Sequence, residues 1–190
     1  MKIAPYERAR LKKLARRCSG RSVLDIGYSQ IPNPYFEKMH RVGLDLVESK
    51  GTPTYEEEIV GDAMNAATLL QGRTFDNIVA GEFIEHVEDP YRFLRGIKPL
   101  LADSGKLLLS TPNPLSFPPV LFELTRNHRF YYTKHHTYYF CPRWVERLLE
   151  GSGYQVVQVT GVGQWTPFGP VPCPATLSYQ VIYEARPNTA

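Results

Sequence analysis

The chain has 190 residues and a formal net charge of +3, with 43% hydrophobic and 22% charged residues. This composition is typical of a globular protein, and the length suits one domain, residues 1–190, with a sizeable core. No apolar run approaches about 18 residues, so we expect no membrane span. The start of the chain shows no apolar stretch of leader-peptide length, and the scattered cysteines lack disulfide or metal spacing. We therefore expect reduced thiols in a cytoplasmic protein.

The charge is unevenly distributed along the chain. Residues 1–21 contain eight Lys or Arg and one Glu, whereas the remainder is net acidic. Apolar residues within residues 1–20 recur at helical spacing, which predicts a basic N-terminal helix. This helix can dock on the domain with its basic side in solvent, or its field can attract an anionic substrate, a nucleic acid or a membrane surface. The charge run alone leaves both interpretations open.

Apolar segments then alternate with helical patterns, which predicts an α/β fold with a parallel sheet. Strands are expected over residues 22–26, 41–46, 58–60, 75–80, 106–110, 154–160 and 177–185, and helices over 64–70, 90–101 and 142–150. Asn33 and Pro34 are typical of a helix N-cap and first turn, so they predict one more short helix that ends near His40.

The periodicity is lost between residues 111 and 140. This segment is rich in proline and in aromatic residues, among them Phe117, Tyr138 and Phe140. A long stretch without regular pattern inside a compact domain is often a functional loop. We interpret residues 111–140 as an aromatic substrate loop or lid, and a hydrophobic flap over the sheet edge is an equally good interpretation.

Acidic residues lie at the ends of three successive predicted strands: Asp25, Asp45 and Asp62. Ligands of open α/β sheets bind along the edge formed by the C-terminal ends of the strands. Asp45 follows Gly27 by 18 residues, a spacing suited to an acid that binds ribose hydroxyls. Each acid could instead cap a turn, but three in register favour a nucleoside site. The G-x-G-x-x-G spacing of nicotinamide dehydrogenases is absent.

At this point the chain resembles the class I S-adenosylmethionine-dependent methyltransferases over about residues 20–160. The resemblance rests on VLDIG at 23–27, GLDL at 43–46, GDAM at 61–64, FDNIVAGEFIEHVEDP at 75–90, GKLLLSTPN at 105–113 and HTYYFCPRWVERLLEGSGYQVV at 136–157. The small-molecule branch of ubiquinone-biosynthesis O-methyltransferases is the most similar. The resemblance implies a single Rossmann-like domain: a seven-stranded, mostly parallel sheet with an antiparallel last strand and helices on both faces.

The resemblance also implies S-adenosylmethionine as the cofactor and S-adenosylhomocysteine as its product. The cofactor-binding residues that it implies are Asp25, Gly27, Tyr28, Asp45, Leu46, Asp62, Ala63, Gly81 and Glu82. In this assignment Asp25 contacts the methionine end, Asp45 the ribose and Asp62 the adenine. The family usually has glycines two and four residues after Gly27, where this chain has Ser29 and Ile31.

Glu82, Glu85 and His86 are spaced so that a helical turn would place them on one face. An imidazole titrates near neutrality and suits a general base that removes a hydroxyl proton. The same residues could bind a divalent cation, or cap and tether a helix. We favour His86, Glu85 and His136 as catalytic residues and assign no metal site. His136 matches a histidine that the family often carries before a helix start, here Phe140-Cys141-Pro142.

The sequence therefore predicts an S-adenosylmethionine-dependent methyltransferase that methylates an oxygen of a small-molecule or carrier-linked acceptor, such as a sugar, a quinone-like compound or a natural product. The missing glycines leave open a non-catalytic, methyltransferase-like binding module. The basic N-terminus leaves open a nucleic-acid methyltransferase, which the acidic remainder of the chain disfavours. No pattern indicates an oligomeric state.

Overall fold

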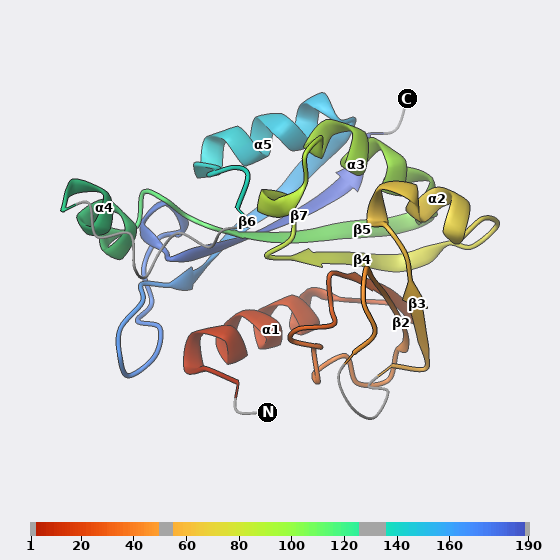
Figure 1. The fold of residues 1–190 in the computed structure, drawn as a ribbon, viewed down its shortest axis with the longest axis horizontal. Helices are drawn as coiled ribbons and strands as arrows, with labels where there is room; N and C mark the ends of the chain where they lie inside the picture. Colours follow the sequence, from red (N-terminus) through yellow and green to blue (C-terminus); the bar gives the residue numbers. More distant parts are fainter. Residues whose placement is uncertain (1–2, 50–54, 126–135, 189–190) are drawn as a thin grey trace.

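The computed structural model describes residues 3–49, 55–125 and 136–188. Within these ranges one sheet has the strand order β3-β2-β1-β4-β5-β7-β6 (Figure 1). The strands are β1 (Ser22–Ile26), β2 (His40–Asp45), β3 (Glu57–Val60), β4 (Phe75–Gly81), β5 (Leu101–Pro112), β6 (Tyr154–Gly163) and β7 (Gln180–Pro187). β7 is antiparallel to β5 and to β6, whereas the pairs among β1 to β5 are parallel. The predicted seven-stranded sheet with an antiparallel last strand is confirmed.

Helices cover both faces of the sheet. α1 (Pro5–Arg17) lies on one face, and α2 (Ala66–Leu69), α3 (Pro90–Ile97) and α5 (Pro142–Gly151) lie on the other (Figure 1). α4 (Phe117–Leu124) stands apart, beyond the end of β5. Short 3-10 turns are η1 (Ala63–Asn65), η2 (Ile84–His86), η3 (Lys98–Leu100) and η4 (Ala175–Leu177). None of the described helices has the length and apolar character needed to cross a bilayer.

Apolar side chains on the two faces of the strands form the two halves of the core. In β1, Leu24 and Ile26 join the cluster under α3 and α5, whereas Val23 packs with Leu14 of α1. Strands that are buried on both faces have continuous apolar runs, which is why VLDI and KLLLS were recognisable as strands in the sequence. The sheet is thereby fixed between two layers, and the C-terminal ends of its parallel strands form one edge.

The N-terminal helix docks through part of its basic side. Lys13 Nζ donates to the carbonyl of Gly161 at 2.7 Å, and Arg17 Nη2 donates to Thr160 Oγ1 at 2.6 Å. Arg17 also forms an ion pair with Glu184 of β7 at 3.3 Å. These contacts fix α1 across β6 and β7 and support the docking interpretation of the basic segment.

The short helix predicted after Asn33 does not form. The Asn33 side-chain oxygen accepts a hydrogen bond from the Tyr35 N–H at 3.0 Å, and its amide donates to the Leu11 carbonyl, also at 3.0 Å. The prediction was wrong because Asn33 and Pro34 suit an Asx-turn as well as a helix start, and here the side chain closes a turn.

The predicted irregular segment 111–140 is more ordered than expected where it is described. β5 continues to Pro112, and α4 occupies residues 117–124 with a proline in its first turn, where a missing N–H is harmless. Residues 126–135 lie outside the described residues. The prediction of one continuous loop was therefore wrong, and the role as a substrate loop or lid stays a prediction.

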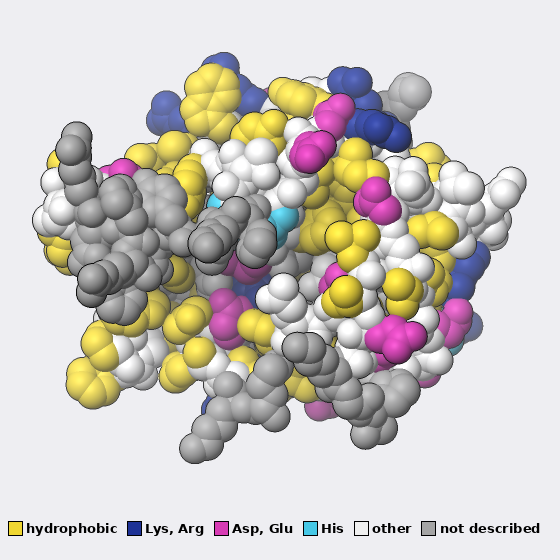
Figure 2. All heavy atoms as spheres, viewed as in Figure 1, with side chains coloured by type: hydrophobic (Ala, Val, Ile, Leu, Met, Phe, Trp, Pro, Cys, Tyr) yellow, Lys and Arg dark blue, Asp and Glu magenta, His cyan; other side chains and the backbone are white. Residues whose placement is uncertain are grey.

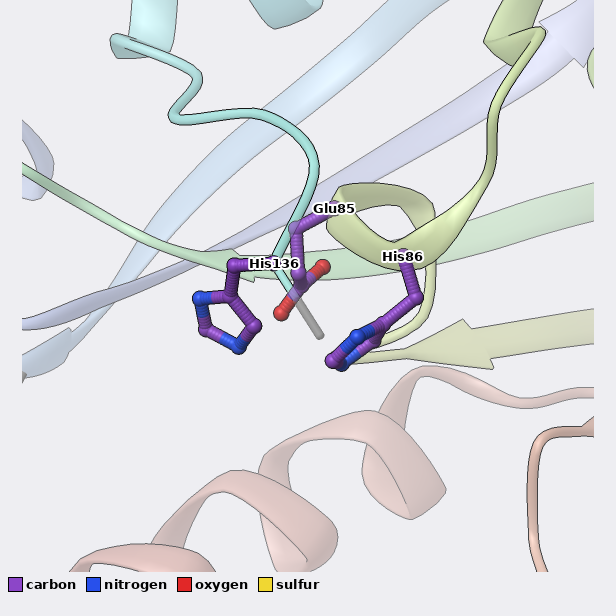
Figure 3. A group of neighbouring side chains, drawn as sticks. All are labelled: Glu85, His86 and His136. Carbon is purple, nitrogen blue, oxygen red and sulfur yellow. The ribbon is translucent and has the colours of Figure 1, made fainter. Parts of the chain in front are cut away.

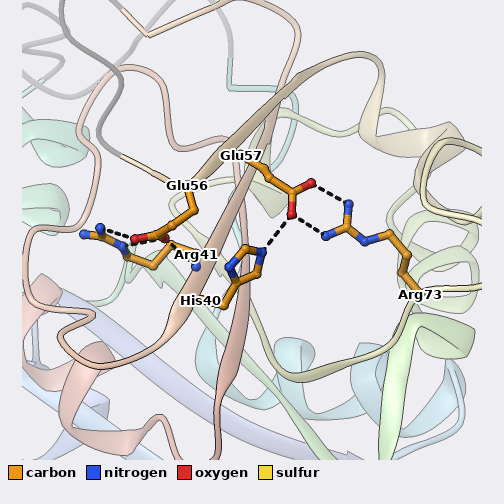
Figure 4. Close-up of polar contacts among 5 residues, drawn as sticks. All are labelled: His40, Arg41, Glu56, Glu57 and Arg73. Carbon is orange, nitrogen blue, oxygen red and sulfur yellow. Dashed lines mark hydrogen bonds and ion pairs between the residues drawn. The ribbon is translucent and has the colours of Figure 1, made fainter.

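Ion pairs join β2, β3 and the segment before β4 at the sheet edge (Figure 4). Arg41 Nη2 lies 2.6 Å from Glu56 Oε1, and Arg73 Nη1 lies 2.8 Å from Glu57 Oε2. His40 Nε2 lies 2.7 Å from Glu57 Oε1. We call these five side chains the edge network.

Candidate functional site

A cavity of about 510 Å³ opens at the C-terminal ends of β1, β2 and β4. This volume is within the usual range of small-molecule sites. Histidine, acidic and basic side-chain atoms gather in a hollow near the middle of the face shown in Figure 2. The predicted site residues in its lining are Asp25, Gly27, Tyr28, Asp45, Leu46, Gly81, Glu82, Glu85, His86 and His136. The structure therefore brings together most of the residues singled out from the sequence.

Asp62 and Ala63 are not part of this lining. The Asp62 carboxylate accepts a hydrogen bond from the Met64 N–H at 2.9 Å and so caps η1, while Ala63 is buried at 7% exposure. Capping accounts for Asp62 without a ligand. Its contact with adenine stays a prediction.

Asp45 organises the altered turn after β1. Its carboxylate accepts hydrogen bonds from the Ser29 N–H at 3.0 Å and from the Leu46 N–H at 2.7 Å. Gly27 has φ +75°, and a Cβ there would lie 2.6 Å from the Phe83 ring. The turn thus needs its one glycine, and Asp45 holds the backbone where further glycines are missing.

Tyr28 lines the cavity near Asp25, and Tyr55 packs behind it. Tyr28 lies over Gly43 of β2, where a Cβ would come within 2.5 Å of its ring. The Tyr28 and Tyr55 rings lie 5.0 Å apart, and the Tyr55 hydroxyl donates to Asp25 at 2.5 Å. The sequence analysis missed Tyr55. The glycine inside β2 marks the close approach of Tyr28, whereas no local pattern points to Tyr55.

Helix α1 contributes a buried ion pair that the sequence analysis also missed. Arg10, at 4% exposure, pairs with Glu7 at 2.5 Å and donates to Ser110 Oγ at 3.4 Å. Its guanidinium fills the space beside Gly81, where a Cβ would lie 2.5 Å from Nη1. Glu7 is the only acid in the basic segment and lies three residues before Arg10, which was the available signal.

Glu82 belongs to this buried network and lies outside η2, the turn that carries Glu85 and His86. It has φ +54° and precedes η2. Its carboxylate accepts hydrogen bonds from Ser110 Oγ at 3.1 Å and from Gln180 Nε2 at 3.0 Å. The expectation that one helical turn would present Glu82 together with Glu85 and His86 was therefore wrong.

The acids of the cavity are held in an environment that disfavours their charge. Burial raises the pKa of Asp25 to about 7, against the hydrogen bond from Tyr55 and the charge of Arg10, which lower it. Burial also raises the pKa of Glu82 and of Glu85, and the charge of Glu82 adds to the effect on Glu85. Strongly perturbed carboxyl groups that share one cavity are typical of functional sites.

Glu85, His86 and His136 come together although His136 is 50 residues away in sequence. One potential ligand atom from each lies within 4.8 Å of the others. The two imidazole rings are 4.7 Å apart and nearly perpendicular. The three candidate catalytic residues predicted from the sequence thus form one spatial cluster in the lining of the cavity.

Comparison with known proteins gives the family. A family model described as a methyltransferase domain matches residues 4–159. Two probable S-adenosylmethionine-dependent methyltransferases of Mycobacterium tuberculosis are 30% identical over 124 residues, covering 57% of this chain and 42% of theirs. A small RNA 2'-O-methyltransferase of Tetrahymena thermophila is 24% identical over 63% of this chain and 30% of its own length. The chain thus spans less than half of these curated relatives.

Solved structures agree in fold. An S-adenosylmethionine-dependent methyltransferase of Archaeoglobus fulgidus has a TM-score of 0.71 and 17% identity, covering 94% of this chain and 91% of that one. A possible histamine N-methyltransferase of Thermotoga maritima has a TM-score of 0.72 and 19% identity, covering 95% and 88%. Membership of the ubiquinone-biosynthesis branch stays a prediction. The chain belongs to the methyltransferase-domain family and carries an S-adenosylmethionine-dependent methyltransferase domain.

Proposed function

We propose that this domain transfers the methyl group of S-adenosylmethionine to a hydroxyl oxygen of a small-molecule or carrier-linked acceptor. The observation that carries the proposal is that Asp45, on the cofactor side, and the cluster of Glu85, His86 and His136 line one cavity. Similar folds occur in enzymes crystallised with small ligands, such as a 1,6-didemethyltoxoflavin-N1-methyltransferase of Burkholderia thailandensis with its substrate and S-adenosylhomocysteine (TM-score 0.63). We therefore propose a sugar, a quinone-like compound or a natural product as the acceptor.

The lining suits this cofactor. S-adenosylmethionine carries a sulfonium and an ammonium group, and the carboxylates of Asp25 and Glu82 face the cavity. Each Asp45 oxygen accepts one backbone hydrogen bond and keeps acceptor capacity for ribose hydroxyls. Asp25, which lines the cavity and accepts a hydrogen bond from Tyr55, would contact the methionine end of the cofactor.

The residues on the acceptor side provide alignment and a path for a proton. When bound, the cofactor supplies a methyl group on a positively charged sulfur. The acceptor oxygen forms a bond to this carbon as the carbon–sulfur bond breaks, and the electron pair stays on sulfur. The hydroxyl proton leaves toward Glu85, His86 and His136. Fixed alignment of the reacting atoms and assistance to the proton are the contributions expected of the protein.

Calorimetric titration with S-adenosylhomocysteine, followed by transfer from labelled S-adenosylmethionine to small-molecule extracts, tests the proposal. We expect the wild-type protein to bind S-adenosylhomocysteine and to give a product whose NMR spectrum shows an O-methyl group. His86→Ala should retain this affinity and lose turnover. Absence of binding would refute S-adenosylmethionine as the methyl donor. A product methylated on nitrogen or carbon would refute the proposed oxygen acceptor. Unchanged turnover in His86→Ala would show that His86 does not assist the proton transfer.

The same protein samples test two alternative functions, an RNA methyltransferase and a non-catalytic binding module. Similarity to a small RNA 2'-O-methyltransferase favours an RNA acceptor, although Lys13 and Arg17 of the basic helix are engaged in docking. An RNA affinity that falls steeply with salt and RNA methylation above that of small molecules would establish this alternative. A protein that fails to bind S-adenosylhomocysteine would instead be a non-catalytic binding module.

A further inference from the structure

The cavity has a second end, away from Asp45. The strand order places β1 and β2 on one side of β4, and β5 and β7 on the other. Pro112 ends β5 and pairs with Gln180, the first residue of the antiparallel β7, so both lie at the same edge of the sheet as Asp45. Side chains of α1 lie beside them in the cavity lining. We call this part of the lining the α1 end: Tyr6, Glu7, Pro112, Tyr179 and Gln180.

The α1 end adjoins the proposed reaction centre. In Figure 3, α1 runs below Glu85, His86 and His136, and these three side chains line the same cavity as the side chains of α1. If Asp45 holds the ribose at the end of β2, the cofactor extends over β1 and the α1 end remains for the acceptor. The chemistry of the α1 end therefore bears on the class of acceptor.

The described side chains around the α1 end are rich in hydrogen-bond acceptors. Gln180 Nε2 donates to Glu7 Oε1 at 2.9 Å and to Glu82 Oε2 at 3.0 Å. Both N–H groups of this amide are thereby used. Each of the two carboxylate oxygens accepts no other hydrogen bond from the described residues and keeps acceptor capacity. The α1 end thus offers free acceptors next to donors that are already engaged.

The Gln180 side chain carries a further acceptor, its carbonyl oxygen. Gln180 is 2% exposed, and its Oε1 has no hydrogen-bond partner among the described residues. A reversed amide would direct Oε1 at the carboxylates of Glu7 and Glu82, so the two bonds from Nε2 fix the orientation. A buried amide oxygen without a partner is costly. This atom is a separate observation that points to a ligand with donor groups.

Two tyrosines add ring surface and hydroxyl groups to the α1 end. The rings of Tyr6 and Tyr179 lie 6.0 Å apart and nearly perpendicular, at 84°. Burial, together with the charges of nearby glutamates, raises the pKa of both tyrosines, so their hydroxyls stay protonated at neutral pH. Aromatic rings can cover the apolar face of a ligand while a few polar groups fix its orientation.

The ligand that matches these acceptors is a neutral donor. Arg10 is 4% exposed and pairs with Glu7, so a cationic ligand at the α1 end would lie close to a buried guanidinium and be repelled by it. The carbonyl oxygens of a quinone-like compound would meet further acceptors. A polyol brings several uncharged hydroxyl donors, and its C–H groups can contact the tyrosine rings.

We propose that the α1 end binds a polyhydroxylated acceptor of the sugar class. Glu7 and Gln180 accept hydrogen bonds from hydroxyls other than the one that is methylated, and Tyr6 and Tyr179 cover the sugar ring. The role of this ligand as methyl acceptor rests on the proposed function, and the proposal selects the sugar among the acceptors named there. Glu7 and Gln180 are then specificity-determining residues, because a site built to bind hydroxyls rejects an analogue that lacks one.

Calorimetric titration of the full-length protein, saturated with S-adenosylhomocysteine, tests the proposal. The probes are the methyl glycosides of glucose, galactose and mannose, their monodeoxy analogues, and catechol and hydroquinone as flat comparison compounds. In the wild type we expect at least one glycoside to bind about 10-fold more tightly than either flat compound. Loss of one of its hydroxyls should weaken binding by about 10-fold to 100-fold, as expected for a hydrogen bond to a charged group.

Two variants identify the contacting residues. Glu7→Gln and Gln180→Met should each weaken the glycoside by about 10-fold and should shrink the penalty for one particular deoxy analogue. A merely structural defect would weaken every glycoside and keep that penalty. The Glu7 side chain is 12% exposed, so its variant should fold even if Gln180→Met does not. Glu57→Gln, which removes an arginine-paired carboxylate of the edge network, is the matched control and should bind the glycoside like the wild type.

The proposal is overturned if no glycoside binds at high millimolar concentration, or if catechol or hydroquinone binds more tightly. Equal deoxy penalties in the wild type and in Glu7→Gln would also overturn it. Each of these results, obtained with bound S-adenosylhomocysteine, would leave the methyltransferase function intact. The same titration without S-adenosylhomocysteine separates the reverse case: a protein that binds the glycoside but not S-adenosylhomocysteine would retain the polyol site and refute the methyl donor.

Discussion

Acidic side chains occur in two settings in this molecule, at the sheet edge and in the cavity. In the edge network each carboxylate has an arginine partner: Glu56 pairs with Arg41, and Glu57 pairs with Arg73 and also contacts His40 (Figure 4). These side chains are partly exposed to solvent. The hydrogen bonds from Arg41 lower the pKa of Glu56 to about 2, and those from Arg73 and His40 lower that of Glu57.

In the cavity, carboxylates outnumber cationic side chains. Five carboxylates of the described lining share the guanidinium of Arg10, and burial raises the pKa of Asp25, Glu82 and Glu85. The edge network is complete with its own charges, so it serves the fold. In the cavity, burial disfavours the charged forms of these acids, so a positively charged ligand would favour their ionised forms. This difference supports the structural role of the acids in the edge network and the functional role proposed for the acids of the cavity.

Substitution of Arg10, the cationic side chain of the cavity, should have the largest effect on stability. Arg10→Met leaves Glu7 and Glu82 without their nearest cation in a buried network, and we expect a loss of about 3–5 kcal/mol in the free energy of unfolding. Urea denaturation at neutral pH measures it. The matched variant at the edge, Arg41→Met, should lose only about 0–1 kcal/mol because Glu56 is open to solvent. Equal losses would contradict the contrast between the two regions.

The pH dependence of stability should differ in sign between the two regions. Burial raises the pKa of Asp25 to about 7 in the folded chain, above its ordinary value of 3.8, so the folded state holds the proton more tightly. Its contribution to stability is present below the unfolded pKa and is lost as pH rises through about 7. The glutamates of the edge network have lowered pKa values, so their contribution is lost as pH falls.

Urea denaturation between pH 4 and pH 8, an interval of about 4 units chosen from these pKa values, compares the wild type with two variants. In Asp25→Asn we expect a smaller fall of stability with rising pH. Asp76→Asn is the control: backbone hydrogen bonds from Arg21 and Ser22 lower the pKa of Asp76, so this variant should keep the wild-type fall. An unchanged slope in Asp25→Asn would show that Asp25 is not the titrating group.

The two regions also differ in how far their sequence revealed them. The acids at strand ends were found because parallel strands end at one edge, and Asp25 and Asp45 do line the cavity. Asp62 has the same pattern but caps the 3-10 turn η1. An acid between a strand and a helical turn is typical both of a ligand site and of a helix cap, so the pattern alone does not distinguish them. Arg10 and Tyr55 were missed because their contacts bridge 100 and 30 residues of sequence, to Ser110 and Asp25. Only the folded topology creates such contacts.

The fold itself was more predictable than the site. The apolar runs of β1 and β5 and the alternation with helices determine an α/β sheet. The error at Asn33 arose because its capping side chain bonds locally in both a turn and a helix start. His136 was placed by resemblance, and its proximity to Glu85 depends on two hydrogen bonds to the Glu85 carbonyl that no local pattern encodes.

Loss of the strand-end acid on the cofactor side should have an intermediate effect. We expect Asp45→Ala to weaken S-adenosylhomocysteine binding by about 10-fold to 100-fold, since hydrogen bonds to charged groups contribute about 1.5–3 kcal/mol. Calorimetry measures it, and the melting temperature of the variant shows whether the turn at Ser29 is retained. Asp62→Ala is the matched control and should lose about 1 kcal/mol of stability as a cap. An equal loss of affinity in this control would establish the adenine contact predicted from the sequence.

The smallest effect should come from the edge network. Glu56 is 41% exposed, so Glu56→Gln should change the free energy of unfolding by less than about 1 kcal/mol, and 1 M salt should abolish the difference. Affinity for S-adenosylhomocysteine should be unchanged. A loss of affinity for S-adenosylhomocysteine in Glu56→Gln would contradict this prediction and would be informative. Glu56 adjoins Tyr55, whose ring lies 5.7 Å from the Arg41 guanidinium and whose hydroxyl binds Asp25. Weaker binding in Glu56→Gln would therefore mean that the edge network positions Tyr55, and that the two regions act as one.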